Sequence, residues 1–329
     1  MSNGGDCMNK KLILCNLILL TAVSLAGCNT SHVDNDPPLA EIPPNSGELN
    51  SDSDKIQVTY RDNTPKVLIP EAPGTQTSGN ELVNVDYSNI SEGYVIIDYF
   101  GTNDKIKLQI TGPEGITITY DFKLSGEAYP LSQGSGTYKI VLFEHAYDTQ
   151  YTTAFSDVFE ADITNEFGPF LYTTHTVVFD RDSECVAKAE ELAAKAENDI
   201  VVIENVFNYI LDNLSYDHEF ADVVTGDYIP TPDKTFKSNK GICSDYATLM
   251  AAMLRSQGIP TRLEVGYVDE EYHEWVSVYT KEYGWLEGII HFDGQNWVMM
   301  DPTMSDSMGL KDNYKFITSG EHYTLKFIY

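Results

Sequence analysis

The sequence is poor in cysteine and in positive charge. Only five of its 329 residues are cysteine, and 21 Lys and Arg stand against 50 Asp and Glu, for a formal net charge of −29. Such a chain has no basic stripe that would neutralise phosphates, which excludes a nucleic-acid-binding protein. The sequence also lacks a loop with the alternating acidic ligands and the glycine of an EF-hand. We therefore interpret the excess carboxylates as a solvated acidic surface.

The N-terminal segment has an apolar run that is short for a membrane span. Lys10 and Lys11 precede the apolar residues 12–25, and Leu25-Ala-Gly-Cys28 ends the run. A positive flank, a short apolar core and small residues before a cleavage point are typical of a secretory signal. The last four residues resemble the lipobox of bacterial lipoproteins, which implies cleavage before Cys28 and lipidation of its thiol. The alternative is a plain signal peptide or an uncleaved anchor. We expect residues 1–27 to be a signal peptide and the protein to be lipid-anchored at the cell membrane, facing outside the cytoplasm.

The cysteines that remain after such cleavage are too few to build a fold on disulfides. Apart from Cys28, only Cys185 and Cys243 would remain as free thiols. A disulfide between these two is the competing interpretation. Cys185, however, shares a helical face with Ala189 and Leu192, so we predict that it is a small core residue. Two cysteines and scattered histidines lack the paired spacing of metal ligands, and we predict neither a metal site nor a cofactor.

Composition divides the first half of the mature chain into a tether and a β domain. Residues 28–80 are rich in Pro, Ser, Asp, Asn and Gly, which predicts a flexible tether. Residues 81–166 contain short alternating runs such as Tyr94-Val-Ile-Ile-Asp-Tyr99, separated by turn residues. This pattern predicts an all-β immunoglobulin-like sandwich. Its role as a spacer or as a recognition module for a wall or protein surface stays open.

Residues 167–329 combine helical patterns with later strand patterns, which predicts an α+β domain. A strand-like run comes first, over residues 171–179. The apolar spacing then predicts helices over about 183–196, 200–214 and 244–257. Further strands are expected at 263–267, 274–279, 295–300 and 324–328.

The third of these helices begins beside Cys243. Apolar residues recur on one face at three- and four-residue spacing, and Gly258 with Pro260 ends the helix. At a helix N-terminus, unpaired N–H groups and the positive end of the dipole favour a thiolate. We therefore expect the pKa of Cys243 to lie below its usual value of about 8.5, as a nucleophile requires.

A thiol nucleophile needs a base and a group that orients the base. Of the seven histidines, His273 lies in an alternating strand pattern, and His291 precedes a predicted Asp293-Gly294 hairpin turn. Spacing alone does not choose between these two histidines.

Three segments in one order resemble the transglutaminase-like superfamily. Gly241-Ile-Cys-Ser-Asp-Tyr-Ala247, followed by Gly258-Ile-Pro-Thr-Arg262, resembles its active-site segment. His273-Glu-Trp275 resembles its histidine motif, and Trp297-Val-Met-Met-Asp301-Pro-Thr303 resembles its aspartate motif. The resemblance covers roughly residues 207–303 and implies a papain-like α+β fold. It also implies a triad in which Cys243 is the nucleophile, His273 the base and Asp301 the orienting group.

The resemblance also suggests supporting residues and one departure. Tyr216, Tyr246 and Trp275 are expected to bind substrate or to pack beside the site. The family has a small residue after the histidine, whereas this chain has Glu274. Because neighbouring side chains of a strand point to opposite faces, we expect Glu274 not to need contact with the site.

The chemistry expected from this triad is attack of a thiolate on an amide carbonyl to give a thioester. Water as acceptor makes the protein a peptidase or amidase, which is the predicted function, acting on proteins or peptides, including cell-wall peptides. An amine acceptor makes it a cross-linking transamidase, the first alternative. The second alternative is a non-catalytic binding or scaffold lipoprotein.

Overall fold

The computed structural model describes residues 60–268, 270–292, 297–299 and 323–329. The predicted signal peptide, Cys28, most of the predicted tether and Asp301 lie outside these ranges. Within them, no helix combines the length and the apolar character that a membrane crossing requires.

The first half of the described chain forms two four-stranded antiparallel sheets. One has the order β1-β2-β3-β6 and the other the order β5-β4-β7-β8. The strands of the first sheet are β1 (Thr77–Gly79), β2 (Val83–Asp86), β3 (Tyr94–Tyr99) and β6 (Glu127–Pro130). Those of the second are β4 (Ile106–Thr111), β5 (Thr117–Phe122), β7 (Gly136–Tyr147) and β8 (Gln150–Ala161).

Strand alternation creates the core between these two sheets. In β4, Ile106, Leu108 and Ile110 are buried while the residues between them are partly exposed. They join one hydrophobic cluster with Val85 and Ile97 of the other sheet. The antiparallel two-sheet arrangement agrees with the alternation in the sequence, and its immunoglobulin-like type remains a prediction.

The second half is built on a five-stranded antiparallel sheet with helices against it, as the sequence predicts for an α+β domain. The sheet order is β14-β13-β12-β11-β15. Its strands are β11 (Thr261–Val268), β12 (Glu271–Thr280), β13 (Gly284–Phe292), β14 (Trp297–Met299) and β15 (Tyr323–Ile328). The helices are α1 (Glu184–Ala193), α2 (Asp199–Asn213), α3 (His218–Ala221), α4 (Pro232–Ser238) and α5 (Cys243–Ser256).

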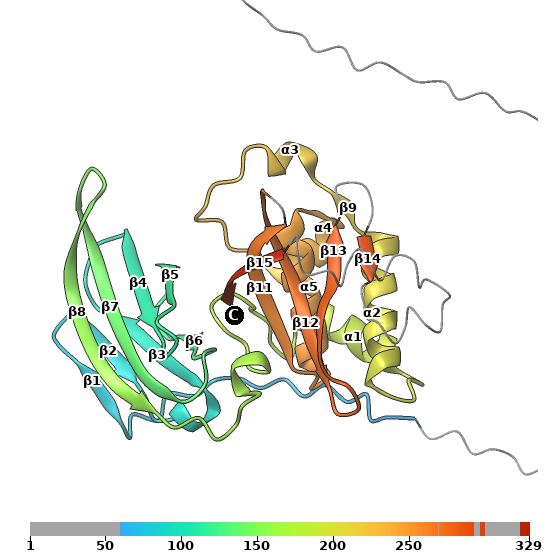
Figure 1. Ribbon diagram of the computed structural model, residues 1–329, viewed down its shortest axis with the longest axis horizontal. Coiled ribbons are helices and arrows are strands. Elements are labelled where there is room, and N and C mark those ends of the chain that lie inside the picture. The colour runs from blue at the N-terminus through green and yellow to red at the C-terminus, as the bar shows by residue number, and fades with distance from the viewer. Residues whose placement is uncertain (1–59, 269, 293–296, 300–322) are drawn as a thin grey trace, which may run out of the picture. The chain divides into compact units, whose positions relative to one another are not determined.

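Helix α5 is the centre of this half. It contacts β11 and β12 on one side and α1, α2 and α4 on the other (Figure 1). Because it is covered from both sides, every residue after Cys243 in α5 is buried, polar ones included. The sequence predicts a single apolar face for this helix, and the structure buries the whole circumference instead. Each fully buried Leu or Met contributes roughly 1.5–3 kcal/mol, so α5 anchors the core.

The predicted tether ends earlier than residue 80. The backbone N–H groups of Arg61 and Lys66 donate to the carbonyls of Ala196 (2.8 Å) and Ser256 (2.6 Å), and Val67 joins the helical core. Strand β1 then takes up residues 77–79. In Figure 1 this segment runs along the helical half before the chain enters the β sheets. Polar composition was a poor guide here because backbone groups, which every residue carries, make these contacts.

Two further expectations differ from the structure. The run 171–179 forms turns and one isolated bridge from Tyr172 to Leu68 rather than a strand. Between the helices predicted over 200–214 and 244–257, where the sequence predicts no element, the structure contains α3, α4 and two short paired strands, β9 (Ser215–Tyr216) and β10 (Lys240–Gly241). Helices of four and seven residues carry too few turns for an apolar period to show in the sequence.

Candidate active site

Cys243 is the first residue of α5, as the sequence predicts. The N–H of Ile242, the residue before the helix, donates to Oδ2 of Asp245 at 2.9 Å, which satisfies one donor at the helix start. The glycine at 241 is required by this arrangement. A Cβ there would lie 2.5 Å from the Cβ of Asp245, closer than atoms approach without displacement.

Asp245 also fixes the loop that precedes α4. Its Oδ1 accepts hydrogen bonds from the hydroxyls of Tyr228 (2.6 Å) and Thr235 (3.0 Å). One buried carboxylate thus joins the start of α5 to α4 and to the loop before it. Hydrogen bonds to a carboxylate stabilise more than hydrogen bonds between neutral groups. The start of α5, which carries the Cys243 thiol, is therefore well ordered.

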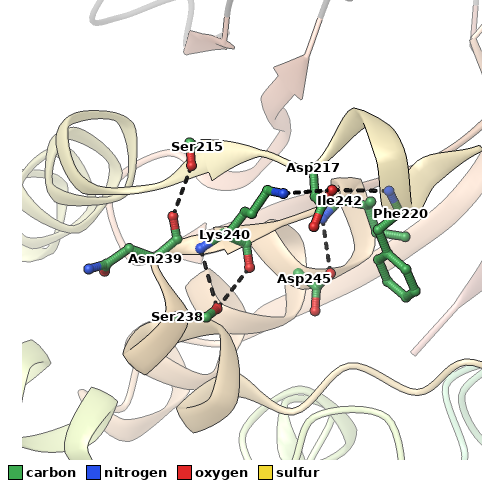
Figure 2. Close-up of polar contacts among 8 residues, drawn as sticks. All are labelled: Ser215, Asp217, Phe220, Ser238, Asn239, Lys240, Ile242 and Asp245. Carbon is green, nitrogen blue, oxygen red and sulfur yellow. Dashed lines mark hydrogen bonds and ion pairs between the residues drawn. The ribbon is translucent and has the colours of Figure 1, made fainter.

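The β9–β10 pair brings Tyr216 next to the start of α5. Its two strands are parallel, with Gly241 opposite Tyr216. Figure 2 shows how side chains extend this pairing: Nζ of Lys240 lies 3.0 Å from Oδ1 of Asp217, which also accepts from the N–H of Phe220 at 3.0 Å. The pairing holds together two segments that are 25 residues apart in the chain.

A cavity of about 550 Å³ opens in front of Cys243. Tyr216, Tyr272 and Glu274 line it together with the cysteine. The loop over residues 221–230 and the end of the chain at Phe327 and Tyr329 also contribute walls. A further wall comes from the β sheets, through Thr119, Tyr120 and Asp121 of β5.

The pKa of the Cys243 thiol is raised, contrary to the expectation from the helix dipole. Burial raises its pKa to about 12, and the nearby carboxylate of Glu274 adds to this effect. The backbone N–H groups of Glu274 and Ser244 favour the thiolate, but they do not offset the burial. Both described thiols are free, and Cys185 lies fully buried in the core as predicted.

Glu274 lines the cavity, which corrects the expectation that it need not contact the site. It lies on the face of β12 that carries Val276 and Val278, and these two valines belong to the core around α5. Burial, with a smaller effect of Asp245, raises the pKa of Glu274 to about 7. The sequence shows that the two valines share the strand phase of Glu274, but it does not show which face of β12 meets α5.

His273 lies on the opposite face of β12 from Glu274. Its side chain is buried, and its ring centroid lies 6.4 Å from that of Trp275 with the planes 17° apart. His273 is not among the described residues that line the cavity, whereas Cys243 is. The structure therefore brings Cys243 and Glu274 together and places His273 one residue away on the strand.

The comparisons with known proteins agree with the sequence motifs. Residues 186–302 match the family model of the transglutaminase-like superfamily. This segment is a transglutaminase-like domain. It contains Cys243, His273 and Asp301, so all three motif residues lie inside the matched range.

Two relatives match parts of this chain. UPF0252 protein MJ1282 of Methanocaldococcus jannaschii is 31% identical over 96 residues, which cover 26% of this chain and 27% of the relative. The uncharacterized protein YebA of Bacillus subtilis is 28% identical over 124 residues, 35% of this chain and 17% of the relative. The chain thus spans about a quarter or less of the length of these two relatives.

A solved structure of a proposed cysteine protease from Cytophaga hutchinsonii superimposes with a TM-score of 0.35 and 12% identity. The match covers 78% of this chain and 74% of that one.

The supporting residues of the transglutaminase-like domain take three different positions. Tyr216 lines the cavity, with its ring 4.9 Å from that of His218. Tyr246 is buried in the core around α5 and Trp275 is buried behind β12, where its indole N–H donates to Oε2 of Glu264 at 2.6 Å. Only Tyr216 of the three faces the cavity.

Several of the residues that line the cavity were not predicted from the sequence. Tyr272 flanks the histidine motif, Tyr228 lies in the loop before α4, and Asp121 belongs to the β sheets. No periodicity marks them, because they come from segments that meet only in the folded chain. Within the described ranges no three His, Cys, Asp or Glu side chains are arranged to hold a metal ion.

Proposed function

We propose that this protein is a lipid-anchored thiol enzyme that hydrolyses amide bonds of peptides or proteins outside the cytoplasm. The observation that carries the proposal is Cys243, placed at the start of α5 in the transglutaminase-like domain and facing a cavity of about 550 Å³. A cavity of this size is within the range of small-molecule and peptide side-chain sites.

The proposed reaction has two halves. The sulfur of Cys243 attacks the carbonyl carbon, the C–N bond breaks, and the amine leaves with the proton that the thiol gave up. Water then attacks the thioester, releasing the acid and restoring the thiol. The backbone N–H of Cys243, at the first turn of α5, is the proposed donor to the oxyanion.

Because burial keeps the Cys243 thiol protonated, the reaction needs a base. The motif assigns this role to His273, oriented by Asp301, and we retain that assignment as part of the proposal. Glu274 is the competing candidate, since it lines the cavity with the thiol and its pKa of about 7 suits proton transfer near neutral pH.

The anchor and the β sheets complete the proposal. Lipidation at Cys28 would hold the enzyme at the membrane surface, where wall peptides are among the accessible substrates. The orders β2-β3-β6 and β8-β7-β4-β5 support an immunoglobulin-like sandwich. Replacing Cys28 with Ala should abolish incorporation of a labelled fatty acid and release the protein from membranes.

Single-residue variants test the catalytic roles. Cys243→Ala should lower amide hydrolysis at least about 10⁴-fold while thermal unfolding stays within about 1 kcal/mol of the parent, because nucleophile removal costs this much in comparable enzymes. Full activity in this variant would refute the proposal. Incorporation of a labelled primary amine into a glutamine peptide, in place of hydrolysis, would identify a transamidase instead.

The same assay separates the two candidate bases. His273→Asn should abolish hydrolysis at every pH if His273 takes the thiol proton. If His273→Asn stays active and Glu274→Gln loses activity on all substrates, the base is Glu274.

A further inference from the structure

Carboxylates line the cavity in front of Cys243. Three carboxylates line it, those of Asp121, Asp227 and Glu274, and no Lys or Arg does among the described lining residues. His175 lines it as well, but its Nδ1 lies 2.7 Å from a carboxylate oxygen of Glu127. Any positive charge on this histidine is therefore already balanced.

The carboxylates differ in how their charge is balanced. Asp121 lies 2.5 Å from Nζ of Lys107, and Asp227 lies 3.6 Å from Nζ of Lys123. Glu274 takes part in none of the ion pairs found among the described residues. Among the described residues, its carboxylate therefore lines the cavity beside the nucleophile without a cation paired to it.

A second carboxylate acts electrostatically on Glu274. Asp245, at the start of α5, contributes to the raised pKa of Glu274 after the larger effect of burial. No ion pair among the described residues includes either carboxylate, so their mutual repulsion disfavours ionisation of Glu274. A cation in the cavity would remove this repulsion.

The remaining cavity wall suits an ammonium group. Tyr216, Tyr228, Tyr272 and Tyr329 are among the residues that line it. Aromatic faces attract cations, most strongly where water is partly excluded. A carboxylate flanked by tyrosine rings is therefore complementary to a primary or substituted ammonium, and repels an anionic group.

We propose that the cavity selects amide substrates that carry an ammonium group next to the scissile bond, with Glu274 as the counter-charge that determines this specificity. The proposal rests on the proposed function for its reaction, and names the substrate class of that same site. The net charge of −29 would also steer such cationic substrates toward the protein at low ionic strength.

Small charged thiol reagents test this cavity without any knowledge of the substrate. The full chain is treated with cationic aminoethyl, neutral methyl and anionic sulfonatoethyl methanethiosulfonate, and modification of Cys243 is followed by peptide mass spectrometry. The thiolate attacks the reagent sulfur, a disulfide forms and methanesulfinate leaves. Each rate is divided by the rate for free cysteine in the same buffer, so that intrinsic reagent reactivity cancels.

We expect the normalised cationic-to-anionic rate ratio at Cys243 to be at least about tenfold, the factor that corresponds to about 1.4 kcal/mol. Glu274→Gln should lower the ratio several-fold, whereas Glu282→Gln, at an exposed turn position, should leave it unchanged. The ratio does not depend on the thiolate fraction, since all reagents require the same thiolate. A shift of the Cys243 pKa in the variant therefore does not affect the result.

Salt provides a measurement that needs no variant. Between about 10 mM and 1 M NaCl the ratio in the parent protein should fall toward one, because the screening length shortens from about 30 Å to about 3 Å. A ratio near one at low salt, an unchanged ratio in Glu274→Gln, or no modification of Cys243 by any reagent would each overturn the inference.

The reagents require no catalysis, so the two proposals fail separately. A cation preference in a protein that cleaves no amide would refute the proposed function and leave the cavity selectivity standing. Amide cleavage with equal rates on lysyl and norleucyl peptides would refute the selectivity and leave the function standing.

Discussion

A buried charged side chain lies at each end of helix α5, and the two side chains differ in their partners. At the C-terminal end the fully buried Arg255 donates to the carbonyls of Thr261 (2.8 and 3.0 Å), Tyr172 (3.1 Å) and Tyr329 (3.1 Å). At the N-terminal end Glu274 of β12 lines the cavity beside Cys243, and none of the ion pairs among the described residues includes it. Arg255 thus joins three separate parts of the chain, whereas the charge of Glu274 is available to a ligand.

The difference separates stability from function along one helix. A buried charge with several hydrogen bonds holds a structure in place, whereas a half-buried charge without a counter-ion costs stability and persists where a ligand uses it. On this comparison, changes at the C-terminal end should unfold the protein, and changes at the N-terminal end should alter its chemistry.

The largest effect on folding is expected at Arg255. Arg255→Met should lower the free energy of unfolding by about 3–5 kcal/mol, because three carbonyls lose donors from a charged group. Urea unfolding followed by fluorescence measures this change. Lys237→Met, in an exposed surface ion pair, is the matched control and should change stability by less than about 1 kcal/mol. A loss at Arg255 as small as in the control would break the contrast between the two ends.

A gain of stability is expected at Glu274. Its folded-state pKa of about 7 lies above the ordinary value of 4.5, so the folded protein binds more protons than the unfolded chain between these pH values. Stability from this group is therefore present below about pH 4.5 and lost as pH rises through 7. Glu274→Gln should be more stable than the parent by on the order of 1–3 kcal/mol at pH 8.

The pH dependence of this gain is the sharper test. The difference between Glu274→Gln and the parent should vanish near pH 4.5, which unfolding curves at several pH values would show. Glu282→Gln, which removes an exposed carboxylate, should show no such trend. A variant less stable than the parent at pH 8 would mean that Glu274 is a structural residue.

The smallest effect is expected at Asp245. Like Arg255 it has several hydrogen-bond partners, and like Glu274 it lies at the N-terminal end of α5. Asp245→Asn keeps one acceptor oxygen but loses the second, so we expect a loss of about 1–2 kcal/mol and looser packing of the loop at Tyr228. Hydrogen exchange over residues 228–242 would detect this loosening. Asp212→Asn, at an exposed position of α2, should leave exchange there unchanged.

Local patterns predicted much of the fold because they report local forces. The alternation of β3 and the apolar periods of α1, α2 and α5 were found within a few residues of the structure's bounds. The short α3 and α4 and the packed segment before β1 were missed, because their order comes from distant partners rather than from an internal pattern.

The sequence by itself determined where Cys243 would lie: a periodic run that starts at a cysteine and stops at Gly258 makes a helix with that cysteine at its N-terminus. It also fixed the order of the three transglutaminase-like motifs. Only the tertiary structure decided that Glu274 faces the cavity, that a strand of the β sheets forms part of its wall, and that burial raises the Cys243 pKa. A strand's two-residue period does not state which face meets its neighbour, and desolvation depends on side chains that the chain brings together from far apart.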